Sequence, residues 1–421
     1  MKSIIKLICS LIVSILVSLP CAYAALKAEN YSIFPQPSGD YSVGHQDYYW
    51  LNQSVCPDPF YNGNNSADFN ADNPKFCREM MVRVYYPSLA PKLLATAYDP
   101  AMIQGMQQSL QQILPDMPGN ILASLDQVNT WDTANAPLTP AMTFPVVIFS
   151  PGFGEDENTY VALIDELVSQ GYIVVALNNT FISYSVSFPD GPTVSNISAK
   201  TTTTFMASQD DIKFVLQQLY SLHNSDDIFQ AMNLDEIGVV GHSPGADMAM
   251  YLGHTQTSED KAAVALDPYD ASDLGVTLNY QFNIPFMVMH ADTWFCNDTH
   301  APIASINADS YFIVITQMEH MNFSDWGLFP NQEAFSYALQ NSTTFYNDLY
   351  SPSSNTLGQI DGEWALTIEN AYILQFFNHY LKDAPLGWLQ NPIRHFPSVG
   401  AYYIGPAQID LPAEWPNAPC S

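Results

Sequence analysis

The residue with the clearest capacity for chemistry is Ser243, the centre of a Gly-His-Ser-Pro-Gly pentapeptide at residues 241–245. An apolar segment of strand character, 237–240, precedes the pentapeptide, and a helical-looking segment, 246–252, follows it. A serine at a sharp strand-to-helix turn, flanked by glycines that let the chain close tightly, is typical of a nucleophile that attacks acyl groups. The other interpretation is a glycine-rich turn without chemistry. The position between strand and helix favours the nucleophile.

A serine hydroxyl is a weak nucleophile unless a histidine accepts its proton and a carboxylate orients that histidine. After Ser243, the apolar segment 262–266 ends at Asp267, and the apolar segment 312–315 is followed closely by His320. Their order along the chain, serine, acid and histidine, is the usual one for this arrangement. Asp292 competes with Asp267 as the acid because it also follows an apolar segment, 286–289. We favour Asp267, with Asp292 as the alternative.

Acyl transfer also needs backbone N–H groups that stabilise the developing oxyanion. The loop 150–154, Ser-Pro-Gly-Phe-Gly, follows the apolar segment 145–149 and offers the N–H of Phe153. We expect His242 to be structural and to pack beneath Ser243. The remaining histidines have no comparable placement at a strand end: His45, His223, His254, His290, His300, His379 and His395. No cysteine pair has the spacing of a zinc site, and we expect neither a metal nor a cofactor.

The elements that would position these residues alternate regularly after residue 144. Short continuous apolar segments, typical of buried strands, alternate with amphipathic helices. The expected strands are 82–86, 145–149, 172–177, 237–240, 262–266, 286–289 and 312–315, and the expected helices are 160–168, 212–222 and 363–381. This pattern predicts an α/β fold with a mostly parallel central sheet and helices on both faces. Ligands bind such sheets at the carboxyl ends of the strands, where the candidate residues lie.

The chain resembles the secreted platelet-activating factor acetylhydrolases and their bacterial relatives from about residue 82 to 381. The resemblance rests on the loop 150–154, the Gly-Tyr-Ile-Val-Val-Ala strand at 171–176, the pentapeptide at 241–245, Leu-Asp at 266–267 and the segment His-Met-Asn-Phe-Ser-Asp at 320–325. It implies an α/β-hydrolase fold and metal-independent hydrolysis of carboxylic esters. Implied substrates are short or oxidised acyl chains of phospholipids, including the sn-2 position, or simple esters. Leu-Asp-Pro at 266–268 also resembles the acid turn of pancreatic-type lipases, which supports Asp267 over Asp292.

Two prolines depart from the family pattern. Pro151 replaces a histidine of the oxyanion loop, and Pro244 directly follows the candidate nucleophile. Proline has no N–H, so Pro244 cannot supply the second oxyanion donor, although proline is well tolerated at the first position of a helix. Candidate replacement donors are Thr180, Gln209 and Tyr269. This departure keeps open a binding protein on a hydrolase scaffold with little or no turnover, and a peptidase on the same fold is a further alternative.

Composition limits the partners. The chain has 421 residues, with 12 Lys and Arg against 42 Asp and Glu, and a formal net charge of −30. Such a surface repels nucleic acid and anionic lipid headgroups. We therefore expect a small-molecule ester or lipid substrate, no nucleic acid partner, and transient contact with a membrane surface only through apolar side chains.

The first residues predict export. A short basic region, an apolar segment at 7–19 and Ala-Tyr-Ala at 22–24 indicate a signal peptide, residues 1–24, cleaved after Ala24. An uncleaved anchor is the alternative, but the apolar segment is short for a membrane span. The prediction is a secreted or periplasmic protein whose residues 25–421 form a single domain, with an irregular N-terminal segment at 25–80 and a C-terminal tail.

Two further features remain open at this point. The mature chain would keep Cys56, Cys77, Cys296 and Cys420, which allow three pairings into two disulfides. We favour Cys56–Cys77 and Cys296–Cys420. Residues 93–128 carry apolar side chains at helical spacing and predict a helical insertion. This insertion is either a lid over the site or ordinary packing.

Overall fold

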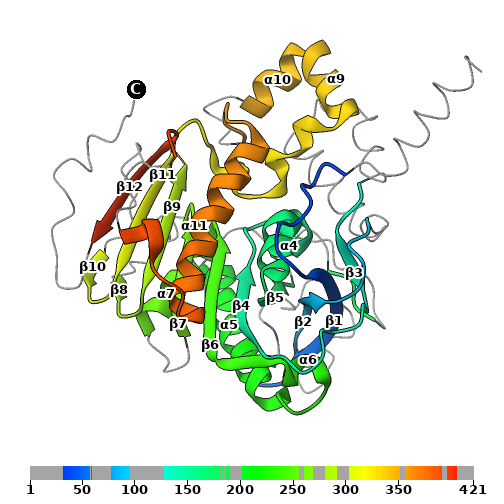
Figure 1. Ribbon diagram of the computed structural model, residues 1–421, viewed down its shortest axis with the longest axis vertical. Coiled ribbons are helices and arrows are strands. Elements are labelled where there is room, and N and C mark those ends of the chain that lie inside the picture. Colours follow the sequence, from blue (N-terminus) through cyan, green and yellow to red (C-terminus); the bar gives the residue numbers. More distant parts are fainter. Residues whose placement is uncertain are drawn as a thin grey trace, which may run out of the picture.

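The computed structural model contains a ten-stranded sheet in the order β12-β11-β9-β7-β6-β4-β5-β2-β1-β3 (Figure 1). The structure describes residues 32–56, 58, 77–94, 128–180, 182–183, 186–189, 202–255, 260–268, 280–291, 303–350, 356–390 and 396–404. The predicted signal peptide, nearly all of the predicted insertion at 93–128, Asp292 and the predicted pair Cys296–Cys420 lie outside these ranges.

The centre of the sheet consists of six parallel strands. Their bounds are β4 Phe144–Ser150, β5 Ile173–Asn178, β6 Met232–His242, β7 Asp260–Leu266, β9 Phe286–Ala291 and β11 Ser310–Ile315. Each overlaps one of the apolar segments expected to form a strand, and their apolar side chains are buried because helices cover both faces. The predicted α/β class with a mostly parallel sheet is confirmed.

The strands at both margins are antiparallel to their neighbours. β2 (Arg78–Ser88) runs antiparallel to both β5 and β1 (Ser42–Asn52), and β12 (Val399–Ile404) runs antiparallel to β11. β3 (Asp132–Ala134) pairs in parallel with β1. The expectation that residues 25–80 are irregular is therefore wrong for β1, whose eleven residues pair along the whole of β2. The sequence pattern did not predict β1 because only part of this strand is buried. Its apolar and polar residues therefore do not alternate regularly.

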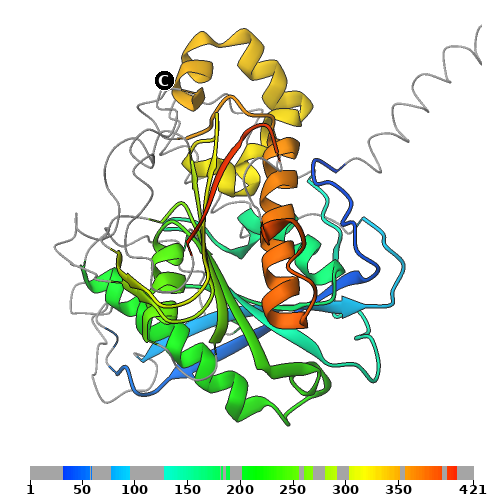
Figure 2. The ribbon, with the colours of Figure 1, turned by 60° about the vertical axis from the view of Figure 1, so that its left-hand side comes forward.

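Helices form a layer on each face of the sheet (Figure 2). α4 (Val161–Ser169) and α11 (Gly362–Lys382) contact each other and share one apolar cluster, whereas α5 (Thr202–Leu222) and α7 (Pro244–Thr255) share a second cluster. α4 and α11 coincide closely with the helices expected at 160–168 and 363–381, whereas α5 begins ten residues before the helix expected at 212–222. α7 begins where the segment after Ser243 was expected to turn helical. The site residues therefore emerge between two packed layers.

The remaining elements are short. They are α6 Asp227–Gln230, α9 Glu333–Asn341 and α10 Thr343–Tyr350, the 3₁₀ helices η4 Glu157–Tyr160, η6 His320–Phe323, η7 Asp325–Gly327, η8 Phe329–Asn331 and η9 Gly387–Gln390, and a small ribbon of β8 Tyr280–Phe282 with β10 Ile303–Ile306. α9 and α10 pack on each other beyond the upper end of α11 (Figure 1). Among the helices in the described ranges, none combines the length and the apolar character needed to cross a membrane.

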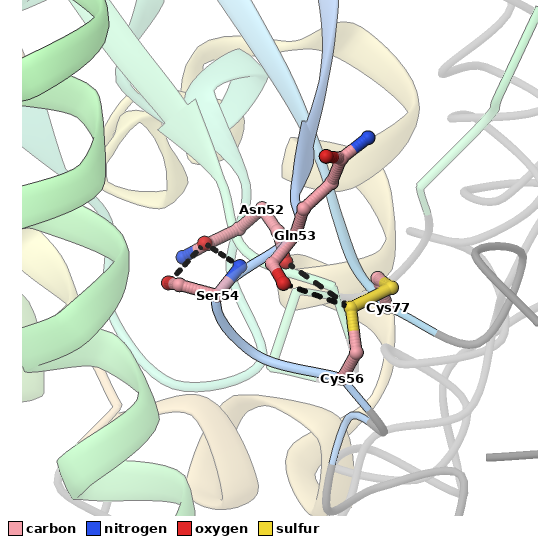
Figure 3. Close-up of a disulfide and its surroundings, with 5 residues drawn as sticks. All are labelled: Asn52, Gln53, Ser54, Cys56 and Cys77. Carbon is pink, nitrogen blue, oxygen red and sulfur yellow. Dashed lines mark hydrogen bonds between the residues drawn. A yellow bond between two sulfur atoms is a disulfide. The ribbon is translucent and has the colours of Figure 1, made fainter. Parts of the chain in front are cut away.

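A disulfide joins Cys56 to Cys77, as predicted (Figure 3). It closes a loop between the end of β1 and the start of β2, so it ties together two strands that are already paired. Beside it, the buried guanidinium of Arg78 donates to Asp58 at 3.3 Å and to the two carboxylate oxygens of Asp211 at 3.0 Å and 2.6 Å. The bridge restricts the unfolded chain and thereby favours the folded state.

Candidate active site

Ser243 lies at the sharp turn between β6 and α7, in the left-handed region of backbone conformation, with φ of 55°. This conformation costs a non-glycine residue about 1–3 kcal/mol and is typical of functional turns. The flanking glycines allow it: a Cβ on Gly241 would lie 2.2 Å from the carbonyl oxygen of Gly245, and a Cβ on Gly245 would lie 2.0 Å from that of Ser150. The Gly-x-Ser-x-Gly spacing is thus required by close backbone contacts.

Asp267 follows β7 directly, and His320 follows β11 at the start of η6. The strands end at one edge of the sheet because Leu266 of β7 pairs with Met289 of β9, and Ile315 of β11 pairs with Ala291. His320 Nε2 lies 2.8 Å from Ser243 Oγ, and His320 Nδ1 lies 2.5 Å from Asp267 Oδ2. The structure therefore brings together the three residues that the sequence singled out.

The carboxyl group of Asp267 is fully buried and held on both oxygens. Oδ1 accepts the backbone N–H of Ala291 at 2.9 Å, and His290 Nδ1 lies 3.5 Å from the same oxygen. Burial by itself raises the pKa of this carboxyl, but hydrogen bonds from His290 and His320 outweigh it and hold the pKa well below its ordinary value. Asp267 is therefore ionised and can stabilise a positive charge on His320.

His290 is a residue that the sequence reasoning missed, since no special placement was expected for it. Its position at the end of β9, next to the strand that carries Asp267, is the signal that could have identified it. Asp292, the alternative acid, lies outside the described residues. His242 lies beneath Ser243 as expected, and its ring is packed against that of His320, with centroids 4.5 Å apart.

The turn that carries His320 is fixed by the residues that follow it. The side chain of Asn322 accepts the backbone N–H groups of Glu319 at 2.9 Å and Gly358 at 2.7 Å. Asp325 accepts two N–H groups from the first turn of α4, from Val161 at 2.6 Å and Ala162 at 3.2 Å. The segment 320–325 thus connects the histidine to the helix that follows the loop 150–154.

That loop carries Phe153, the expected oxyanion donor. On either side of it, Gly152 donates its N–H to the Tyr160 hydroxyl at 3.1 Å, and Gly154 donates its N–H to the Ile182 carbonyl at 2.9 Å. These bonds fix the loop on both sides of Phe153, which is half-buried. Pro244 is the first residue of α7 and supplies no N–H, as expected.

The three candidates for a replacement donor are not equivalent. The Thr180 hydroxyl donates to the Glu79 carbonyl at 2.5 Å, so its one proton is already used in that bond. Gln209 is buried, and Tyr269 lies outside the described residues.

Buried carboxyl groups surround the start of α4. Burial raises the pKa of Asp325 to about 8, and burial together with neighbouring carboxyl groups raises the pKa values of Asp156 and Glu157 well above their ordinary values. A carboxyl whose pKa is raised in the folded state binds its proton more tightly there than in the unfolded chain. Its contribution to stability is complete below the unfolded pKa and is lost as the pH rises through the folded value.

We therefore expect the free energy of unfolding to fall as the pH rises from 5 to 8, by up to about 1.4 kcal/mol per pH unit for each carboxyl that titrates in the window. Urea unfolding midpoints at pH 5, 6.5 and 8 measure this. Glu157→Gln should flatten the dependence, because the amide keeps a carbonyl acceptor for the Asn158 side chain and cannot ionise. Asp267 has the opposite sign, but its effect falls below pH 4 and outside the window. A midpoint that rises from pH 5 to 8 would contradict the prediction.

Within the described residues, no group of three His, Cys, Asp or Glu side chains is arranged to hold a metal ion.

Three comparisons with known proteins bear on the chain. The family model "Platelet-activating factor acetylhydrolase, isoform II" matches residues 26–219, a range that ends before Ser243. The platelet-activating factor acetylhydrolase of Canis lupus familiaris is 27% identical over 168 residues, which are 40% of this chain and 33% of the dog protein. That of Cavia porcellus is 21% identical over 387 residues, 83% of this chain and 78% of the guinea pig protein.

Among solved structures, a ferulic acid esterase from Streptomyces cinnamoneus superposes with a TM-score of 0.62 at 21% identity, covering 87% of this chain and 98% of the esterase. This likeness confirms the α/β-hydrolase fold. The match to the dog relative spans about a third of that protein's length, whereas the guinea pig match spans most of it. Together, the family model and these relatives confirm the resemblance that the sequence motifs predicted.

Proposed function

We propose that this chain, which has the α/β-hydrolase fold and is similar to the platelet-activating factor acetylhydrolases, is a carboxylic ester hydrolase that works through Ser243, His320 and Asp267. The observation that carries this proposal is the continuous hydrogen-bonded line from Ser243 Oγ through His320 to Asp267, at 2.8 Å and 2.5 Å. These are the distances that proton transfer requires.

The proposed reaction has two halves. Ser243 Oγ attacks the ester carbonyl carbon while its proton passes to His320 Nε2, and the tetrahedral intermediate then expels the alcohol, which takes that proton. Water attacks the resulting acyl-enzyme with His320 again as base, and the acid leaves as Ser243 Oγ regains its proton. The ionised Asp267 stabilises the positive charge that His320 carries in each transition state. The Phe153 N–H donates to the oxyanion.

The proposed substrates are uncharged or zwitterionic esters with short acyl chains, including phospholipids of that kind. The net charge of −30 disfavours anionic substrates and anionic membranes. We propose that the protein acts outside the cytoplasm after removal of residues 1–24. The Cys56–Cys77 bridge would persist in such an oxidising environment.

Hydrolysis of p-nitrophenyl esters of graded chain length tests the function. We expect turnover with an optimum at short acyl chains. A shift of the optimum to long chains would exclude the short-acyl specificity. No turnover on any ester would contradict the proposal and favour a binding protein on this scaffold, and turnover confined to peptides would favour a peptidase.

The missing N–H at Pro244 leads to a separate prediction. Pro244→Ala restores a backbone donor beside Ser243, and one oxyanion donor typically changes kcat by about 10²-fold. We expect kcat for a p-nitrophenyl ester to rise by about 10- to 100-fold. Steady-state kinetics measures the change, and Pro151→Ala, which alters the other unusual proline, is the matched control. An unchanged kcat in Pro244→Ala would mean that another group already fills this role.

A further inference from the structure

Tyr160 and His242 form a buried pair beneath Ser243 that the proposed reaction does not use. Tyr160 ends η4, the element that follows the loop 150–154, and His242 is the last residue of β6, directly before Ser243. Each side chain is 1% exposed. The Tyr160 hydroxyl lies 2.8 Å from His242 Nδ1. The pair therefore joins the element after the loop to the strand that carries the nucleophile.

The direction of each hydrogen bond follows from its partners. His242 Nε2 lies 3.0 Å from the backbone carbonyl oxygen of His320, which can only accept, so Nε2 carries a proton. The Gly152 N–H donates to the Tyr160 oxygen at 3.1 Å. The Tyr160 hydroxyl proton then points to Nδ1, which accepts it in a neutral imidazole. Burial holds the pKa of Tyr160 well above its ordinary value, so this donor is always present.

The result is a chain of three hydrogen bonds, each with a defined donor. The Gly152 N–H donates to the Tyr160 oxygen, the Tyr160 hydroxyl donates to His242 Nδ1, and His242 Nε2–H donates to the His320 carbonyl. Gly152 is packed closely against both side chains: a Cβ there would lie 3.1 Å from the Tyr160 oxygen and 3.2 Å from His242 Nδ1. The chain therefore spans the short distance between the oxyanion loop and the backbone of His320.

We propose that Tyr160 and His242 are positioning residues, which hold the backbone N–H of Phe153 at a fixed position relative to His320 and Ser243. This inference rests on the proposed function, in which Phe153 supplies the backbone donor. Because Pro244 has no N–H, that function depends more heavily on the loop than a site with two backbone donors would. A displacement of about 1 Å in such a site can lower a rate by about 10²-fold.

Tyr160→Phe removes only the hydroxyl and tests the inference. We expect kcat for a short p-nitrophenyl ester to fall by about 10- to 100-fold while KM stays within about twofold, because the loop donor acts on the transition state. Tyr172→Phe is the matched control. Tyr172, which directly precedes β5, is equally buried, and its hydroxyl donates to Asn378 of α11 at 2.8 Å. The Tyr172→Phe variant should lose about as much thermal stability as Tyr160→Phe and keep the wild-type kcat.

A double-mutant cycle measures the coupling between Tyr160 and His242. His242→Gln keeps an amide N–H for the His320 carbonyl but lacks Nδ1. Tyr160→Phe should therefore lower kcat much less in the His242→Gln background than in the wild type. Additive losses would show that the two residues act separately and would overturn the inference.

A second measurement does not depend on activity. The ¹⁵N chemical shifts of the His242 ring in the wild-type protein, assigned with His242→Gln, should be those of the neutral Nε2–H form. A proton on Nδ1 would overturn the inference, and this measurement decides it if Tyr160→Phe does not fold.

The two proposals can fail independently. Full turnover by Ser243→Ala would refute the proposed function. An inactive Ser243→Ala, together with a Tyr160→Phe variant that loses only thermal stability, as Tyr172→Phe does, would overturn this inference and leave the proposed function in place.

Discussion

Ser243→Ala is expected to lower kcat for a short p-nitrophenyl ester by about 10⁴-fold or more, which is the usual effect of removing the nucleophile of a serine–histidine–acid arrangement. The variant leaves the fold intact, because alanine fits the space and the backbone bond from residue 243 to the Leu266 carbonyl does not involve the side chain. The oxyanion loop and the binding surface remain, so a small residual rate above the uncatalysed one is expected. Steady-state kinetics with the purified variant measures the loss.

Ser169→Ala is a suitable control for this loss. Ser169 is also buried, at the end of α4, and its hydroxyl donates to the Glu166 carbonyl at 2.8 Å. Its removal should cost stability and leave kcat unchanged. If Ser243→Ala kept a rate within tenfold of the wild type, Ser243 would not be the nucleophile.

Asp267→Asn is expected to lower kcat by about 10⁴-fold, the order seen when this acid is replaced by its amide in other hydrolases. The orientation of the new amide is set by Ala291, whose N–H donates to Oδ1 at 2.9 Å and needs an acceptor there. The amide oxygen must face Ala291, so the NH₂ group must face His320 Nδ1. His320 would then be held with its proton on Nε2, from which it cannot accept the proton of Ser243.

Asp292→Asn distinguishes the two candidate acids and should change kcat by no more than a few fold. A large loss in Asp292→Asn combined with a mild loss in Asp267→Asn would reverse the assignment. His290→Ala should have an intermediate effect, because its ring faces Asp267 Oδ1 at 3.5 Å without facing the serine.

The central strands and the candidate site could be predicted because both depend on local patterns. A strand buried on both faces is continuously apolar, as β5 and β9 are, and the residues at its carboxyl end can be read directly from the sequence. Ser243, Asp267 and His320 each come shortly after such a strand. The order of the strands in space then brings their ends together, and the structure places the three side chains in contact.

The features that were missed depend on contacts between distant segments. β1 has a half-covered surface and an irregular pattern, and its pairing with β2 across the Cys56–Cys77 loop decides its structure. β12 lies in the C-terminal region, where no strand was predicted, and it pairs with β11. Tyr160 was expected only as part of an apolar helical face, since nothing local shows that its hydroxyl meets His242, 82 residues away.

The measurement that tests the central claim most directly is labelling of the purified protein with a fluorophosphonate, followed by mass spectrometry of its peptides. Such reagents phosphonylate only a serine whose hydroxyl is activated by a neighbouring base. The account predicts one equivalent of label on Ser243, slowed strongly in Asp267→Asn and absent in Ser243→Ala. Label on a different residue, or no label on a folded protein that hydrolyses esters, would contradict it.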